Sequence, residues 1–171
     1  GAALAAGDFN NDTFADLAIG APFEDVGSVL DAGAINVLYG SAARLTATGN
    51  QQFFQGNGGI GGVAEVGDEF GFALTSGDFN NDTFDDLAIG TPFEDVGTVF
   101  DAGAINVVYG SASRLTATGN QQWLQGSGGI VGVSRASSTP SMPSTRMLRS
   151  CRLVSRWPMP DWLRSTEDRS T

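Results

Sequence analysis

Residues Gly7–Gly20 read GDFNNDTFADLAIG, and residues Gly77–Gly90 read GDFNNDTFDDLAIG. The two stretches are 70 residues apart, and the similarity extends far beyond them. When residues 1–63 are placed over residues 71–133, 50 of the 63 positions are identical. Two segments this similar adopt the same fold. The chain therefore contains two copies of one structural unit, the first over residues 1–70 and the second over residues 71–133.

Apolar residues within each unit alternate with other residues, which is the period of a β-strand rather than of a helix. Clusters of Gly, Asp, Asn and Pro separate the alternating segments, as is typical of turns. We expect strands at residues 2–6, 17–19, 35–39 and 51–55, with counterparts 70 residues later. The predicted fold class is all-β, with two four-stranded antiparallel sheets.

A single four-stranded sheet buries one face at most and leaves its edges unpaired. Repeated sheets of this size are stabilised by packing on their neighbours, and a radial stack of them is a β-propeller of about four to eight blades. Two units do not close such a ring. We therefore expect two blades of an incomplete propeller, which self-assembly of several chains would complete.

The composition excludes several classes of function. The chain has no His and no Lys, and Cys151 is its only cysteine, so the usual nucleophilic triads, Schiff-base lysines and cysteine zinc sites are excluded. Residues 1–133 carry 16 acidic and two basic residues, a net charge of −14. This charge disfavours nucleic acid as a partner and favours cations. No apolar run is long enough to span a bilayer, so we do not expect a membrane contact. We do not expect an enzyme, because no base, nucleophile or cofactor loop can be assembled from these residues.

The acidic loop between the first and second predicted strands places oxygen-bearing groups at positions 1, 3, 5, 7 and 9. Ca²⁺ prefers about six to eight oxygen ligands in a tolerant geometry, whereas Mg²⁺ demands a strict octahedron. We predict one Ca²⁺ in each repeat, two in total, with water completing the shell. The predicted ligands are Asp8, Asn10, Asp12, the Phe14 carbonyl and Asp16 in the first loop, and Asp78, Asn80, Asp82, the Phe84 carbonyl and Asp86 in the second.

Two other interpretations of these loops are an Asx-rich turn and an EF-hand. In an Asx-rich turn the Asp and Asn side chains only cap the backbone. An EF-hand needs a Glu at position 12, where the chain has Ile19 and Ile89, and it needs flanking helices. Position 6 is occupied by Thr13 and Thr83, which resist the positive φ that such loops require. Either the turn differs from the usual one or the affinity for the metal is reduced.

Three short motifs occur in a fixed order around each loop. Phe70-Gly71 opens the second unit, the acidic loop follows, and Ile19-Gly20-Ala21-Pro22 closes the second strand of the first unit. The second unit has Gly90-Thr91-Pro92 at the last of these positions. In this order the motifs resemble the FG-GAP repeat of integrin α-subunit β-propellers and their bacterial relatives. The resemblance implies a seven-bladed propeller with Ca²⁺ in the loops of some blades, held by the ten positions named above.

The resemblance also implies a function. We expect a calcium-binding, non-catalytic repeat module for extracellular protein or glycan binding or for cell adhesion, although no signal peptide is visible in the chain. The alternative is an accessory propeller module of a larger secreted hydrolase. The pairs Glu24-Asp25 and Glu94-Asp95 are interpreted as parts of solvated loops, and Phe53 and Trp123 as part of the blade core.

Residues 134–171 depart abruptly from the repeat pattern. They contain no Gly and seven of the nine Arg residues. We expect a disordered tail, or non-native sequence produced by a shifted reading frame or a truncated gene. A basic amphipathic helix on an anionic membrane is a third interpretation.

Overall fold

A computed structural model describes residues 1–127 and 130–132, which form eight β-strands and no helix. The strands make two four-stranded antiparallel sheets, each in simple sequence order, β1-β2-β3-β4 and β5-β6-β7-β8. The expected fold class is confirmed. The strands are β1 Ala3–Gly7, β2 Asp16–Ala21, β3 Ala34–Tyr39, β4 Thr46–Phe53, β5 Ala73–Gly77, β6 Asp86–Thr91, β7 Ala104–Tyr109 and β8 Thr116–Leu124.

The fourth strand of each sheet differs from the expectation at both ends. β4 begins at Thr46 and ends at Phe53, so it starts five residues before the predicted segment and stops short of Gln55. Its first half is polar and exposed, so it lacks the apolar alternation on which the prediction rested. A bulge in β3 between Val37 and Tyr39 shifts the register at this point. The second sheet repeats the bulge between Val107 and Tyr109.

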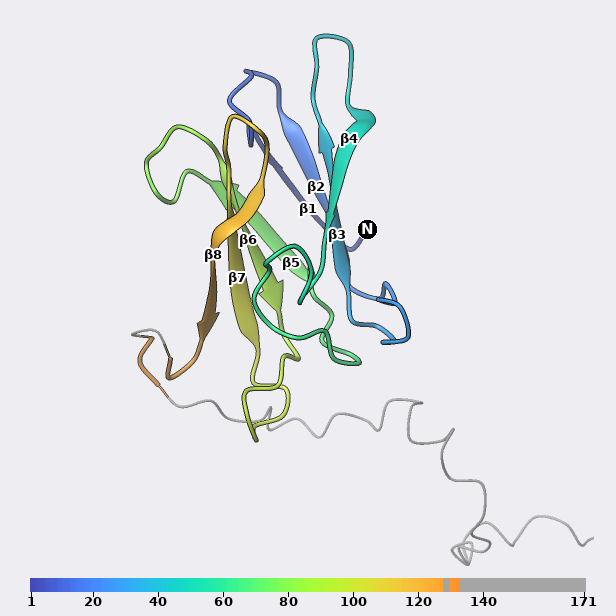
Figure 1. Ribbon diagram of the computed structural model, residues 1–171, viewed down its shortest axis with the longest axis vertical. Helices are drawn as coiled ribbons and strands as arrows, with labels where there is room; N and C mark the ends of the chain where they lie inside the picture. Colours follow the sequence, from blue (N-terminus) through green and yellow to red (C-terminus); the bar gives the residue numbers. More distant parts are fainter. Residues whose placement is uncertain (128–129, 133–171) are drawn as a thin grey trace, which may run out of the picture. The chain divides into compact units, whose positions relative to one another are not determined.

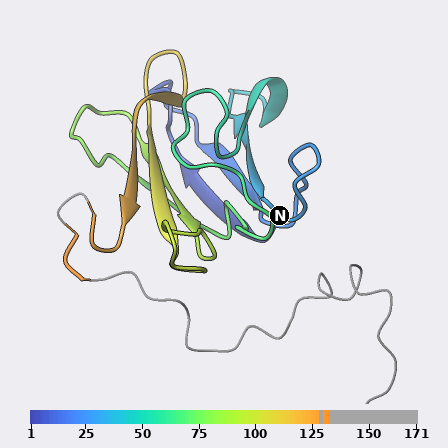
Figure 2. The same cartoon turned by 60° about the horizontal axis from the view of Figure 1, so that its bottom comes forward.

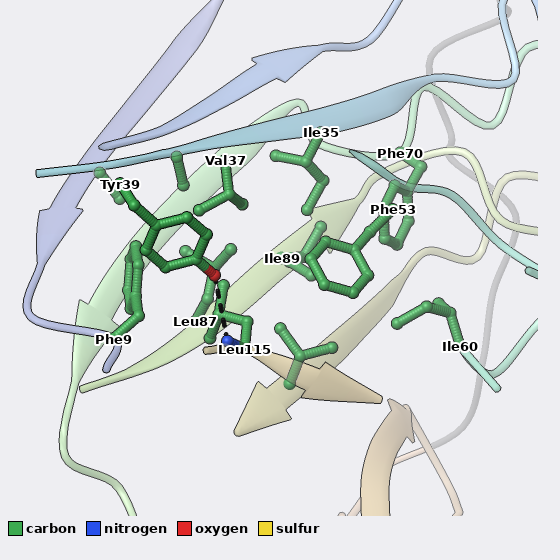
Figure 3. Packing of buried hydrophobic residues seen from close by; sticks show 13 residues of the cluster. Phe9, Ile35, Val37, Tyr39, Phe53, Ile60, Phe70, Leu87, Ile89 and Leu115 are labelled. Carbon is green, nitrogen blue, oxygen red and sulfur yellow. Dashed lines mark hydrogen bonds between the residues drawn. The ribbon is translucent and has the colours of Figure 1, made fainter. Parts of the chain in front are cut away.

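The two sheets pack face to face, and they come closest at their first strands, β1 and β5 (Figures 1 and 2). The core lies between the sheets. Ile35 and Val37 extend from β3 toward Leu87 and Ile89 of β6, and all four side chains are buried (Figure 3). Adjacent sheets stacked in this way stabilise one another by burying apolar area, which neither sheet achieves alone.

Close contacts with the backbone of the other repeat explain why position 20, in β2, is a glycine. A Cβ added to Gly20 would lie 2.0 Å from the carbonyl oxygen of Gly71, which belongs to the other repeat. Gly71 itself has a φ of 87°, in the region that favours glycine. Phe70 beside it is fully buried. The Phe-Gly pair of the second repeat therefore packs against Gly20, the penultimate residue of β2 in the first repeat.

The loops that connect the strands fall into two groups, one at each end of the sheets. The acidic loops after β1 and β5 lie at the end of the sheets where β3 and β7 finish. At this end, Gly40 and Gly110 donate hydrogen bonds to Asp16 and Asp86, the first residues of β2 and β6. The loops 22–33 and 92–103 and the connector 54–72 lie at the other end (Figure 1). The described part of the chain holds no helix long and apolar enough to cross a membrane.

The expectations for the C-terminal segment fall outside the described residues. The chain divides into one unit over Gly1–Ser137 and another over Ser138–Thr171. Both sheets belong to the first unit.

Candidate metal-binding loops

The first acidic loop is closed by its own side chains. The two carboxylate oxygens of Asp8 accept hydrogen bonds from the backbone N–H groups of Asp12, at 3.0 Å, and Thr13, at 2.8 Å. The Asn10 side-chain oxygen accepts a bond from the same Asp12 N–H at 3.1 Å. Because one N–H bonds to both oxygens, the side chains of Asp8 and Asn10 meet at one point of the loop.

Asp12 completes this group. Its Oδ2 accepts a hydrogen bond from the Asn10 amide at 3.0 Å, and its Oδ1 accepts one from the Phe14 N–H at 2.9 Å. The second loop repeats each of these bonds at the equivalent residues, with distances between 2.8 and 3.0 Å. Asp78, the counterpart of Asp8, is exposed, and the hydrogen bond from the Thr83 N–H lowers its pKa. At Asp78 these bonds thus favour the charged form of the carboxylate, which is the form that binds cations.

Asp16 and Asp86 close the base of each loop. Asp16 is buried, and its two oxygens accept hydrogen bonds from the N–H groups of Phe9, at 2.9 Å, and Gly40, at 2.8 Å. Burial raises the pKa of Asp16, the two backbone donors oppose that rise, and the charges of Asp12 and Asp8 add to it. The three carboxylates therefore lie within electrostatic reach of one another. Asp86 has the same partners in the second repeat.

Position 6 adopts the strained conformation that the loop requires. Thr13 has a φ of 76° and Thr83 a φ of 79°. Positive φ is unfavourable for a β-branched residue, by about 1–3 kcal/mol. The loops thus keep the positive φ at this position, and the two threonines carry the strain; the expected reduction in metal affinity stays a prediction.

The two loops are joined to each other. Asp85 Oδ2 accepts a hydrogen bond from the Asp8 N–H at 2.8 Å, and the Asp85 N–H donates to the Asp8 carbonyl at 3.1 Å. The Asn11 amide donates to the Thr83 hydroxyl at 3.1 Å. Sequence reasoning missed the role of Asp85, although the sequence offered a signal. Asp85 is one of the 13 positions at which the repeats differ, and Ala15 takes its place in the first repeat.

The donor chemistry of the loops fits a hard divalent cation, but the site is not preassembled. All the side-chain donors are oxygens, and each hydrogen-bonded oxygen retains a second lone pair. Within residues 1–127 and 130–132, however, no three acidic, His or Cys side chains converge as a metal centre would require. Asp8 and Asp12 are directed instead at backbone N–H groups. The loops therefore have the hydrogen bonding of the Asx-rich turn. A bound cation would be coordinated by the same carboxylate oxygens that accept these hydrogen bonds.

A second acidic cluster lies at the opposite end of the sheets, and it corrects the expectation of a solvated loop around Glu94. Glu94 is only 6% exposed, and its carboxylate accepts hydrogen bonds from the side-chain amides of Gln55 and Gln122. Burial raises its pKa. Glu24, its counterpart in the first repeat, is exposed. The difference arises because the first repeat covers the loop of the second, and no described segment covers that of the first.

Asp68, on the connector between the repeats, belongs to the same acidic cluster. It is 2% exposed, and its Oδ2 accepts a hydrogen bond from the Glu65 N–H at 2.6 Å. Burial raises the pKa of Asp68 to about 7, and the charges of Glu94, Glu65 and Asp95 add to the rise.

Four-stranded antiparallel sheets in sequence order, stacked face to face and closest at their first strands, are units of the β-propeller type. A family model of the FG-GAP repeat matches residues 1–38 and 70–108. The chain therefore contains two FG-GAP repeats, and each match covers nearly all of the first three strands of one sheet.

Curated proteins with similar sequences are much longer than this chain. It is 32% identical to phosphatidylinositol-glycan-specific phospholipase D of Rattus norvegicus over 118 residues, 68% of this chain and 14% of that protein. It is 36% identical to integrin alpha-3 of Cricetulus griseus over 106 residues, 58% of this chain and 9% of that protein. Integrin alpha-3 of Mus musculus matches over the same length at 34% identity. The chain thus spans between 9% and 14% of these relatives.

Proposed function

We propose that this chain is a non-catalytic propeller module whose two acidic loops bind one Ca²⁺ each. The observation that carries the proposal is the grouping of Asp8, Asn10 and Asp12 on one hydrogen-bonded turn, repeated at the equivalent residues of the second loop. Asp16 and Asp86 lie at the bases of the loops and complete an all-oxygen donor set. The bound ion supplies positive charge, which offsets the repulsion among the three carboxylates of each loop.

Binding would also stabilise the contact between the repeats. The loops are bonded to each other through Asp85, so an ion that holds one loop also holds its neighbour. Because Thr13 and Thr83 stay strained and the ion must share the Asp oxygens with backbone N–H groups, we expect modest affinity. A Kd of about 10⁻⁴–10⁻³ M is typical of extracellular calcium modules.

Calorimetric titration with Ca²⁺ tests this assignment. The full chain should bind two ions, and Asp12→Ala and Asp82→Ala should each remove one, because each deletes one carboxylate from one loop. Glu24→Ala, which removes an exposed acid outside the loops, should leave both sites intact. Two binding events of unchanged heat in both loop variants would show that the ions bind elsewhere.

We infer an extracellular context, with a protein or glycan as the partner, because integrin alpha-3 is among the relatives. The similarity to a phosphatidylinositol-glycan-specific phospholipase D favours the second candidate, an accessory module of a larger hydrolase. The parent gene distinguishes the two candidates. A hydrolase sequence adjacent to the repeats would favour the accessory role, and a membrane anchor or an array of repeats alone would favour adhesion.

A further inference from the structure

The contact between the two repeats joins two different faces. Face A, on the first repeat, consists of Phe9, Ile35, Tyr39, Gln51 and Gln55. Face B, on the second repeat, consists of Leu87, Ile89, Glu94, Ser111, Arg114 and Leu115. Their apolar members form one buried cluster between the sheets (Figure 3).

Polar contacts hold the two faces in register. Gln51 Nε2 donates to the Leu115 carbonyl at 3.0 Å. The Leu115 N–H donates to the Tyr39 hydroxyl at 3.1 Å (Figure 3). The Arg114 guanidinium lies 4.9 Å from the centre of the Tyr39 ring, a cation–π contact. The Ser111 N–H donates to the Phe9 carbonyl at 3.2 Å.

The second repeat carries face A again, with the same residue types, and the described residues form no third sheet that packs on it. Its members are Phe79, Ile105, Tyr109, Gln121 and Gln125. Phe79 is 51% exposed and Ile105 49% exposed, whereas Phe9 and Ile35 are fully buried. Tyr109 still donates to Gln121 at 2.6 Å, as Tyr39 does to Gln51, so this face is already arranged for docking.

The first repeat likewise carries face B again, as Leu17, Ile19, Glu24, Ser41, Arg44 and Leu45. All six residue types match those of face B on the second repeat. Leu45 is 41% exposed, whereas Leu115 is 2% exposed. Each end of the two-repeat stack therefore presents one half of a contact that the chain forms internally.

We propose that a second copy of this chain docks on the first, with face A of the second repeat of one copy on face B of the first repeat of the other. A second copy of the chain is the expected partner because each residue that defines face A or face B has the same residue type in the other repeat. The internal contact shows how the two faces fit together. Such a contact is heterologous, so it leads to a closed ring or to an open chain. Copies of two blades close only rings with an even number of blades, which are six or eight for three or four copies.

Two substitutions between the repeats weaken the contact between copies relative to the internal one. Asp85 lies beside face B, and its carboxylate accepts the Asp8 N–H in the internal contact; beside the exposed copy of face B it is replaced by Ala15. Gly61, where a Cβ would lie 3.2 Å from the Cβ of Gln122, is replaced by Val131 at the other exposed face. The acidic charge of residues 1–133 also opposes association, most strongly at low salt.

Sedimentation velocity and light scattering on the full 171-residue chain at moderate ionic strength test the proposal. We expect association that increases with concentration up to about 100 μM, with species at multiples of 17.7 kDa. Ile105→Asp should abolish association, because it places a charge at the centre of face A. Ala15→Asp and Val131→Gly restore the residues of the internal contact, and each should lower the dissociation constant several-fold. The proposal would be overturned if the wild type and the variant with both restoring substitutions stayed monomeric up to about 100 μM.

Val63→Asp is the matched control. Val63 is 71% exposed and belongs to neither face, so this variant should associate as the wild type does. Circular dichroism should show the same β-sheet spectrum for Ile105→Asp and Val63→Asp, since both replace exposed side chains. Association that survives Ile105→Asp, or that Val63→Asp abolishes equally, would place the contact on another surface and contradict the proposal. Measurements in chelator and in Ca²⁺ separate this result from the calcium assignment.

Discussion

Thr13 and Gly20 lie on either side of the start of β2, and at both positions the backbone limits which side chain is acceptable. Thr13 has a φ of 76°, which the loop geometry imposes. At Gly20 the carbonyl of Gly71 in the other repeat lies where a Cβ would be. The first residue is the wrong type for its conformation, whereas the second is the only type that fits. Substitutions at the two positions should therefore change stability in opposite directions.

Thr13→Gly should stabilise the folded chain by about 1 kcal/mol, because relief of the positive-φ strain exceeds the added entropy of the unfolded state. Thr83→Gly should stabilise it less, since Thr83 also accepts a hydrogen bond from Asn11. Urea unfolding followed by circular dichroism measures both variants. A Thr13→Gly chain less stable than the wild type would show that the threonine is not strained.

Gly20→Ala should destabilise the chain by about 1–3 kcal/mol or more, because the new methyl group would overlap the Gly71 carbonyl and force the sheets apart. Gly90→Ala is the matched control at the same position of the second repeat. Its Cβ would meet nothing nearer than the Cβ of Ala73 at 3.3 Å, so it should cost less than about 1 kcal/mol. Equal losses in the two variants would contradict the role assigned to the close contact.

At the scale of strands and loops, the alternation of apolar residues correctly predicts two four-stranded antiparallel sheets, because strands such as β2 and β3 bury one face. The polar start of β4 was not predictable in this way, since the backbone pairing of Thr46 with Tyr39 forms it without an apolar signal. Asp8, Asn10 and Asp12 meet as the loop spacing suggests. The burial of Glu94 was not predictable from the pair Glu94-Asp95, because Gln55 of the other repeat determines it.

The buried Asp68 should make the folded chain more stable in mild acid than at neutral pH. Its ordinary pKa of 3.8 is raised to about 7 by burial, so between these values the folded chain holds a proton that the unfolded chain has released. The corresponding contribution to stability falls as the pH rises through this window, and the loss is complete above about pH 7. Glu94, whose pKa is also raised, adds to the effect in the same direction.

Asp68→Asn tests this dependence, because asparagine retains the oxygen that accepts the Glu65 N–H and removes the charge. At pH 8 the variant should gain about 1–3 kcal/mol over the wild type, and at pH 4 the two should be equal. Thermal unfolding of dilute protein across this range provides the comparison. Glu24→Gln, at an exposed acid, should follow the wild-type curve. A wild-type pH dependence that persists in Asp68→Asn would assign it to other groups.

At the scale of the whole molecule, two repeats produce one covered contact and two open faces. The repeat period predicts this arrangement, because a sheet that must pack on a neighbour at both faces finds only one neighbour within the described residues. What the sequence does not reveal is how closely the open faces match the covered ones. That match depends on which of the 13 differing positions lie at the contact, and only the structure locates Ala15 and Val131 there.

The two acidic loops lie beside each other at the same end of the stack, so a bound ion in each would brace the contact between the repeats. Crystals grown in Ca²⁺ and measured for anomalous scattering test this claim most directly. The account predicts one anomalous peak within each loop, between Asp8 and Asp16 and between Asp78 and Asp86. Well-ordered loops without a peak, with Asp8 and Asp12 still bonded to backbone N–H groups in saturating calcium, would contradict it.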